Sequence, residues 1–287
     1  MSSSEQELPR IGNAELVVDL LAEVWESIAS LGDVLSERDW DRLTECPGWT
    51  VRDQVSHVVG TERMLLGEQA PPPSGAKPEH VRNMLGEVNE SWVAARRSLA
   101  GSAVLDELRQ VTGRRLEELR AFPPEHFEEI GWSPVGQVPY RTFMEIRVMD
   151  CWVHEQDIRV ATGRPGHGGG RVAELAIDRM MAAMPFVVGK KASAPDGSAV
   201  EFDVGGEVVR RTVVQVREGR AMVIAGEAGQ GGVDGGAVSV LRMDAQPFWR
   251  LSCGRVDPYR AMREGMVELE GDAELGRRVV ENMAFMV

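Results

Sequence analysis

Three polar side chains whose spacing suits a shared site lie in the segment 149–159, MDCWVHEQDIR. Asp150 and His154 are four residues apart, and Asp157 follows three residues later. In a helix of 3.6 residues per turn, these side chains lie within about 60° of one another. A carboxylate and an imidazole placed in this way can bind one metal ion together, or they can form a hydrogen-bonded pair.

Apolar side chains occupy the same sector of the expected helix, which runs over 141–161, namely Phe143, Ile146, Val153 and Ala161. The polar residues are therefore expected to face a core, where an unpaired polar group is costly. A metal ion is one possible partner, and the alternatives are a structural hydrogen-bond pair or a salt bridge to an arginine. The opposite sector is expected to face solvent apart from its tryptophan, and it carries Glu145, Trp152, Gln156 and Arg159.

A third metal ligand must come from another segment, and the chain has five histidines. His167 lies in a glycine-rich stretch, and His80 and His126 stand close to prolines, so all three are expected in solvent. His57 lies within an expected helix, at about 120° from the centre of its valine stripe. That position alone favours a surface histidine over a ligand.

Helices are predicted throughout the first half of the chain. Apolar residues recur every three or four positions between Leu16 and Leu31, which indicates an amphipathic helix. A second helix is expected to begin at Thr50, because Thr50 and Asp53 have the spacing of a capping box. Further helices are expected over 79–100, 102–120 and 141–161.

The second half has a different texture. The glycine-rich stretch 163–170 is expected to end the preceding helix and to form a linker. A helix over 171–184 is followed by β-branched, partly alternating segments that predict strands at 199–204, 208–216, 220–225, 238–243 and 266–271. Helices are expected over 244–251 and 273–284. The prediction is an α plus α/β chain, with a helical domain at 1–165 and a smaller α+β domain at 171–287.

Composition narrows the range of functions. The 287 residues include 43% hydrophobic ones, enough for a full core. A net charge of −13 disfavours binding to nucleic acid. The sequence shows neither an apolar run of membrane-spanning length nor a signal peptide, and its three cysteines form no CxxC pair. We expect a cytoplasmic protein without membrane partners, as a monomer or a homodimer.

Several common catalytic motifs are absent from the sequence, including HExxH, GxSxG, the P-loop and GxGxxG. Cys151 directly follows Asp150 and is expected to belong to the core rather than to act as a nucleophile. Cys46 precedes a proline and is expected to be more exposed, but no residue near it in sequence would activate its thiol.

Two stretches resemble the signatures of the mycothiol-dependent maleylpyruvate isomerase-like family, a DinB-like group. They are CPGWTVRDQVSHVVGTE, at 46–62, and VMDCWVHEQDIRVATGRP, at 148–165. The segments 238–255 and 267–280 resemble the C-terminal domain of the same proteins, which is related to sterol carrier proteins. The resemblance implies a DinB-like four-helix bundle followed by a sterol carrier protein-like domain.

The resemblance also implies a divalent metal, with zinc expected, held by His57, Asp150 and His154. Isomerase members of the family carry Glu where this chain has Asp150, whose side chain is one methylene shorter. Asp157 would orient a ligand imidazole or a bound water, and its alternative role is a hydrogen bond within the helix.

An arginine of the C-terminal domain is linked to substrate in the isomerase. Arg255 is the nearest candidate by motif, with Arg250 behind it, and either residue could instead be a surface cation.

Three protein ligands leave one or two positions open on a zinc ion. A thiol that enters there is favoured as thiolate, which is its nucleophilic form. We therefore expect an enzyme that uses a low-molecular-weight thiol, mycothiol, in transfer to a small electrophile or in its isomerisation. Two alternatives are a metal-dependent hydrolase with Asp157 as base, and a non-catalytic binding protein for an apolar ligand.

Overall fold

A computed structural model describes residues 14–73, 75–224 and 238–286. Contacts within the chain divide it into two compact units between His167 and Gly168. The first unit is helical and the second, smaller unit combines a sheet with helices, so the predicted fold class is confirmed. The predicted domain limits of 1–165 and 171–287 stay predictions, and residues 1–13 of the first domain lie outside the described part.

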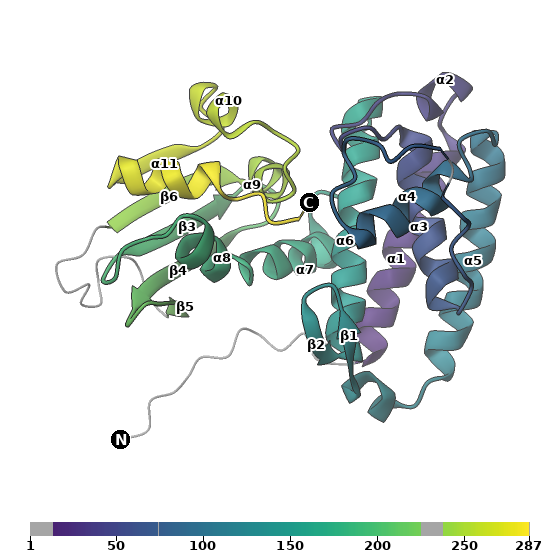
Figure 1. The fold of residues 1–287 in the computed structure, drawn as a ribbon, viewed down its shortest axis with the longest axis horizontal. Coiled ribbons are helices and arrows are strands. Elements are labelled where there is room, and N and C mark those ends of the chain that lie inside the picture. Colours follow the sequence, from purple (N-terminus) through teal and green to yellow (C-terminus); the bar gives the residue numbers. More distant parts are fainter. Residues whose placement is uncertain (1–13, 74, 225–237, 287) are drawn as a thin grey trace. The chain divides into compact units, whose positions relative to one another are not determined.

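Four long helices form the core of the first unit and lie side by side (Figure 1). They are α1 (Ala14–Asp33), α3 (Val51–Leu65), α5 (Gly101–Ala121) and α6 (Tyr140–Thr162). Helices α1 and α3 each contact both α5 and α6. The shorter helical elements of this unit are α2 (Glu37–Trp40), α4 (Met84–Ala94) and the 3-10 helix η1 (Pro124–Glu128).

Local signals fix the start of α3 and the end of α6, the two helices that carry the site. The Asp53 backbone N–H donates to Thr50 Oγ1 at 3.3 Å, and the Thr50 N–H donates to Asp53 Oδ2 at 3.0 Å. This confirms the predicted capping box at the start of α3. Helix α6 ends at Gly163, whose φ of +65° is the left-handed conformation that glycine adopts readily.

Helix α6 is buried on more sides than the helical wheel predicted. Glu145 and Gln156 were expected to face solvent, yet their exposed fractions are 7% and 8%. Trp152, which was excepted from that expectation, is 1% exposed. The chain after α6 folds back against this face. The Trp152 Nε1–H donates to the carbonyl of His167 at 2.8 Å, and the Gln156 amide donates to the carbonyl of Gly166 at 3.2 Å. A wheel cannot show this long-range return of the chain.

A β-hairpin that the sequence patterns did not predict precedes α6. Its antiparallel strands are β1 (Ile130–Ser133) and β2 (Gly136–Pro139). Each strand has four residues, the shortest run in which an alternating pattern can be recognised. The side chains of Ile130 and Trp132 are 65% and 60% exposed, so the hairpin also lacks the buried apolar face that marks most strands.

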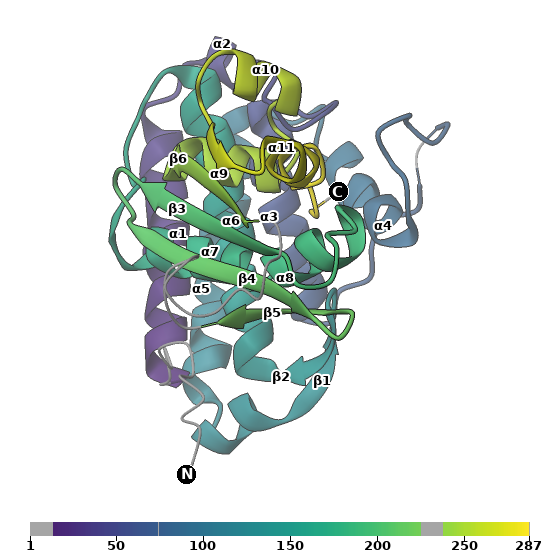
Figure 2. The same ribbon diagram turned by 90° about the vertical axis from the view of Figure 1, so that its left-hand side faces the viewer.

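The second unit contains a five-stranded sheet in the order β5-β4-β3-β6-β7 (Figure 2). Strands β3 and β6 are parallel, and the other neighbours are antiparallel. All five strands were predicted, although residue 225 of the predicted segment 220–225 lies outside the described residues. Their bounds are β3 (Ala199–Gly205), β4 (Arg210–Arg217), β5 (Arg220–Ile224), β6 (Val238–Asp244) and β7 (Glu268–Gly271).

Helices pack on this sheet. Helix α11 contacts β6 and β7, α9 contacts β3 and β6, and α8 contacts β4 and β5. The helical elements of the second unit are α7 (Gly170–Met181), α8 (Met184–Phe186), the π-helix η2 (Val187–Lys191), α9 (Ala245–Ser252), α10 (Pro258–Arg263) and α11 (Ala273–Glu281). None of the helices described in either unit is both long and apolar enough to cross a membrane.

Close packing of α4 on α3 requires a glycine within the first motif, at position 60. A Cβ added to Gly60 would lie 2.4 Å from Trp92 Cβ, whereas a Cβ on Gly113 of α5 would meet no atom within 4 Å. We expect Gly60→Ala to lower the free energy of unfolding by about 1–3 kcal/mol. Gly113→Ala should raise it by about 0.5–1 kcal/mol. Urea unfolding checks both, and stabilisation by Gly60→Ala would contradict the close approach.

Candidate functional site

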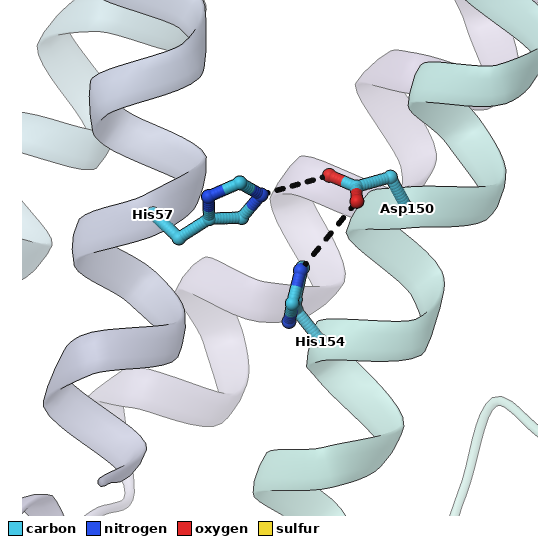
Figure 3. Close-up of side chains that lie close together, drawn as sticks. All are labelled: His57, Asp150 and His154. Atoms are coloured by element: carbon cyan, nitrogen blue, oxygen red, sulfur yellow. Dashed lines mark hydrogen bonds and ion pairs between the residues drawn. The ribbon is translucent and has the colours of Figure 1, made fainter. Parts of the chain in front are cut away.

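His57, Asp150 and His154 lie together between two helices of the bundle. His57 projects from α3, and the other two residues project from α6 (Figure 3). His57 Nε2 is 3.1 Å from Asp150 Oδ2, and His154 Nε2 is 3.5 Å from Asp150 Oδ1. One ligand atom from each residue lies within 4.8 Å of the others, so the three residues form a group that could hold a single metal ion. The fold therefore brings the three predicted ligands together.

Both imidazoles of the cluster are buried. His57 is 5% exposed and His154 is 6% exposed, while the side chain of Asp150 is 21% exposed. The expectation that His57 lies on the surface was wrong. Helix α3 packs against α4, α5 and α6 at once, so residues well outside its valine stripe are also covered.

Burial and neighbouring charges shift the pKa values of the three groups in different directions. Burial lowers the pKa of His57 and so favours the neutral imidazole that metals bind. Burial opposes ionisation of Asp150, but Arg147 and the two histidines outweigh it and hold the pKa of that carboxyl well below its usual value. For His154 burial is likewise outweighed, and Asp150 and Asp157 raise its pKa.

A glutamine orients His154, a role that the sequence patterns did not reveal. The Gln54 side-chain oxygen lies within hydrogen-bond distance of His154 Nδ1, and its amide nitrogen donates to Thr44 Oγ1 at 2.6 Å. With this amide orientation, Nδ1 carries a hydrogen, so in the neutral imidazole the lone pair is on Nε2, on the side of Asp150. Asp157 is fully buried with Oδ2 at 3.7 Å from the same Nδ1, so its orienting role stays a prediction.

Trp49 lies against both imidazoles. Its ring centroid is 5.2 Å from that of His57 and 5.8 Å from that of His154. The Trp49 Nε1–H donates to Glu90 Oε2 at 3.1 Å, which fixes the indole. Trp49, one residue before the capping box, therefore forms an apolar wall beside the two imidazoles.

The donor set fits a divalent metal. Two imidazole nitrogens and one carboxylate oxygen are ligands that zinc accepts, with positions left open for water or substrate. Both histidines are covered from solvent, and an orienting partner holds His154. Within the described residues, His57 Nδ1 is buried without a hydrogen-bond partner, so no hydrogen bond at that nitrogen fixes the tautomer of this ring.

The remaining histidines lie outside the cluster. His167 was expected in solvent, but its side chain is only 15% exposed, and Nδ1 is 2.7 Å from Glu155 Oε2. His80 is also partly covered and lies 3.2 Å from Glu90. His126 contacts the aromatic ring of Phe122.

The arginine candidates belong to the second unit. Arg255 follows α9, and its Nη1 donates to the Cys253 carbonyl at 2.9 Å. It lines a pocket of the second unit together with Leu251 and Val280. Arg250 lies within α9. The positions of Arg250 and Arg255 do not test the predicted contact with substrate, which stays a prediction.

The thiol beside Asp150 is not suited to nucleophilic attack. Burial raises the pKa of Cys151 to about 12, so only about one thiol in ten thousand is ionised at pH 8. We expect iodoacetamide to leave Cys151 unmodified in the native protein and to modify the half-buried Cys46 first. Mass spectrometry after labelling with and without urea measures this, and equal labelling of both residues in the native state would contradict it.

Comparison with known proteins agrees with the motifs. Residues 21–159 match the family model of the mycothiol maleylpyruvate isomerase N-terminal domain. An uncharacterised protein of Mycobacterium tuberculosis is 27% identical over 151 residues, which cover 51% of this chain and 56% of that protein. The chain thus spans little more than half the length of this curated relative.

One solved structure shares the fold over most of the chain. The crystal structure of the mycothiol-dependent maleylpyruvate isomerase aligns with a TM-score of 0.55 and 14% sequence identity, covering 89% of this chain and 93% of that one. A sterol carrier protein domain 2 of Helicoverpa armigera aligns over 39% of this chain and 89% of its own, with a TM-score of 0.29 and 15% identity.

Proposed function

Because the helical unit belongs to the mycothiol maleylpyruvate isomerase N-terminal domain family, we propose that this chain is a metal-dependent enzyme that uses a low-molecular-weight thiol. The thiol is mycothiol, the metal is zinc, and the second substrate is a small electrophile that is isomerised or receives the thiol. The observation that carries the proposal is the buried cluster of His57, Asp150 and His154.

The residues of the cluster suit this role. A bound divalent ion would supply positive charge that favours the thiolate of an entering thiol. The neutral imidazole of His57 and the ionised carboxylate of Asp150 are ready to bind the ion. Gln54 holds His154 with Nε2 toward Asp150, and Trp49 keeps water away from one side of both imidazoles.

Arg255 is our proposed substrate-binding residue in the second unit. A guanidinium recognises a carboxylate through paired hydrogen bonds, and Arg255 lines a pocket there. We further propose that the protein acts in the cytoplasm on small molecules, not on nucleic acid or membranes, as a monomer or a homodimer.

Elemental analysis of the purified chain, followed by titration with a thiol, tests the proposal. We expect about one zinc per chain and a thiol-dependent conversion of an electrophile such as a chlorinated nitrobenzene. Conversion that needs metal but no thiol would instead assign a hydrolase. A chain that binds no divalent metal at micromolar concentrations would overturn the proposal and favour a non-catalytic binding protein.

A further inference from the structure

A buried arginine holds one oxygen of Asp150. Arg147 precedes Asp150 by three residues on α6, and its Nη1 donates to Asp150 Oδ2. Its Nε and Nη2 donate to Glu62 Oε1 on α3 at 3.1 and 2.7 Å. The side chains of Arg147 and Glu62 are 5% and 1% exposed. Because a guanidinium is a rigid planar fork, its contact with Glu62 fixes the direction in which Nη1 points.

The two oxygens of Asp150 therefore have different surroundings. Oδ2 accepts from Arg147 and lies 3.1 Å from His57 Nε2, whereas Oδ1 lies 3.5 Å from His154 Nε2. An aspartate has fewer side-chain torsions than a glutamate, so its carboxylate reaches less far and depends more on its orientation. A partner that fixes Oδ2 also fixes where Oδ1 points.

We propose that Arg147 is the positioning residue of Asp150, an inference that rests on the proposed metal site. Anchored by Glu62, it holds Oδ2 and keeps Oδ1 directed at the side of His154, where the ion would bind. Glu62 lies on α3, the helix that carries His57, and Arg147 lies on α6 with Asp150 and His154. The same two helices therefore carry the proposed ligands and the residues that position Asp150. A carboxylate already oriented for the ion loses less freedom on binding it.

The test is the zinc affinity of the full-length chain, measured by competition with a chromophoric chelator. We expect Arg147→Met to weaken binding about 10- to 100-fold, the range for loss of a residue that orients a ligand. Arg147→Lys keeps the charge without the fork and should lie between Met and the natural residue. The matched control is Arg141→Met, which removes an arginine of the same helix that pairs with Glu128 and Glu145, and its affinity should be unchanged.

A second measurement separates positioning from simple loss of stability. The visible spectrum of the Co²⁺-substituted chain reports ligand geometry, and it should change in Arg147→Met and not in Arg141→Met. Should Arg147→Met fail to fold, Glu62→Gln keeps the shape of the anchor and should shift affinity and spectrum in the same direction.

Each outcome decides between the two proposals. Unchanged affinity and spectrum in Arg147→Met would overturn the positioning role while the metal site stands. Tighter binding would overturn it as well, because Arg147 would then compete with the ion for Asp150. Absence of metal binding by the unmodified chain would instead overturn the proposed function.

Discussion

Replacing His57 with alanine is expected to weaken zinc binding at least about 100-fold, more than the loss of an orienting residue costs. His57 is the only proposed ligand from α3, so without it the ion would be held by Asp150 and His154 of α6 alone. Two ligands on one helix satisfy half of a tetrahedral zinc ion. Elemental analysis after dialysis and chelator competition measure the change.

The matched control for this substitution is His126→Ala. His126 lies in the same unit but packs against Phe122 and Tyr140, outside the metal cluster. The His126→Ala variant should bind zinc with the same affinity as the unmodified chain. Full zinc occupancy in His57→Ala would show that the ligand assignment is wrong.

The predicted part of the site depended on local patterns. The spacing of Asp150 and His154 places them on one helix face regardless of tertiary structure, and the capping box at Thr50 fixes where α3 begins. His57 could not be assigned from its own helix, because its burial comes from packing by α4, α5 and α6. Only the resemblance to the family motif linked His57 with Asp150 and His154.

Other parts of the site depend on contacts between residues far apart in the sequence. Gln54 meets His154 across 100 residues, and Glu62 meets Arg147 across 85. Both polar residues lie on α3, where a helical pattern gives them no partner. A buried polar group in such a pattern predicts that a partner exists but does not identify it. The arginine that we expected as an alternative to metal is present, as Arg147, and it contacts Asp150 beside the two histidines.

Replacing Glu62 with alanine is expected to lower the free energy of unfolding by about 3–5 kcal/mol. The Glu62 carboxylate lies between two buried guanidinium groups. Oε1 accepts from Arg147 at 2.7 Å, and Oε2 accepts from Arg115 at 3.2 Å. The side chains of Arg115 and Arg147 are 1% and 5% exposed, so water does not readily replace the lost carboxylate at either cation. Urea unfolding followed by circular dichroism measures the loss.

The loss in free energy of unfolding depends on how exposed the ion pair is. A second glutamate in the same unit shows this dependence. Glu87 pairs with Lys77 at 2.8 Å, much as Glu62 pairs with its arginines, but both side chains are about half exposed. Water replaces the lost partner there, so Glu87→Ala should cost only about 0–1 kcal/mol. Glu62→Gln keeps the shape and should fall between the two variants. An equal, small loss in Glu62→Ala and Glu87→Ala would contradict the buried ion network, because two buried cations would each lose one of their carboxylate partners.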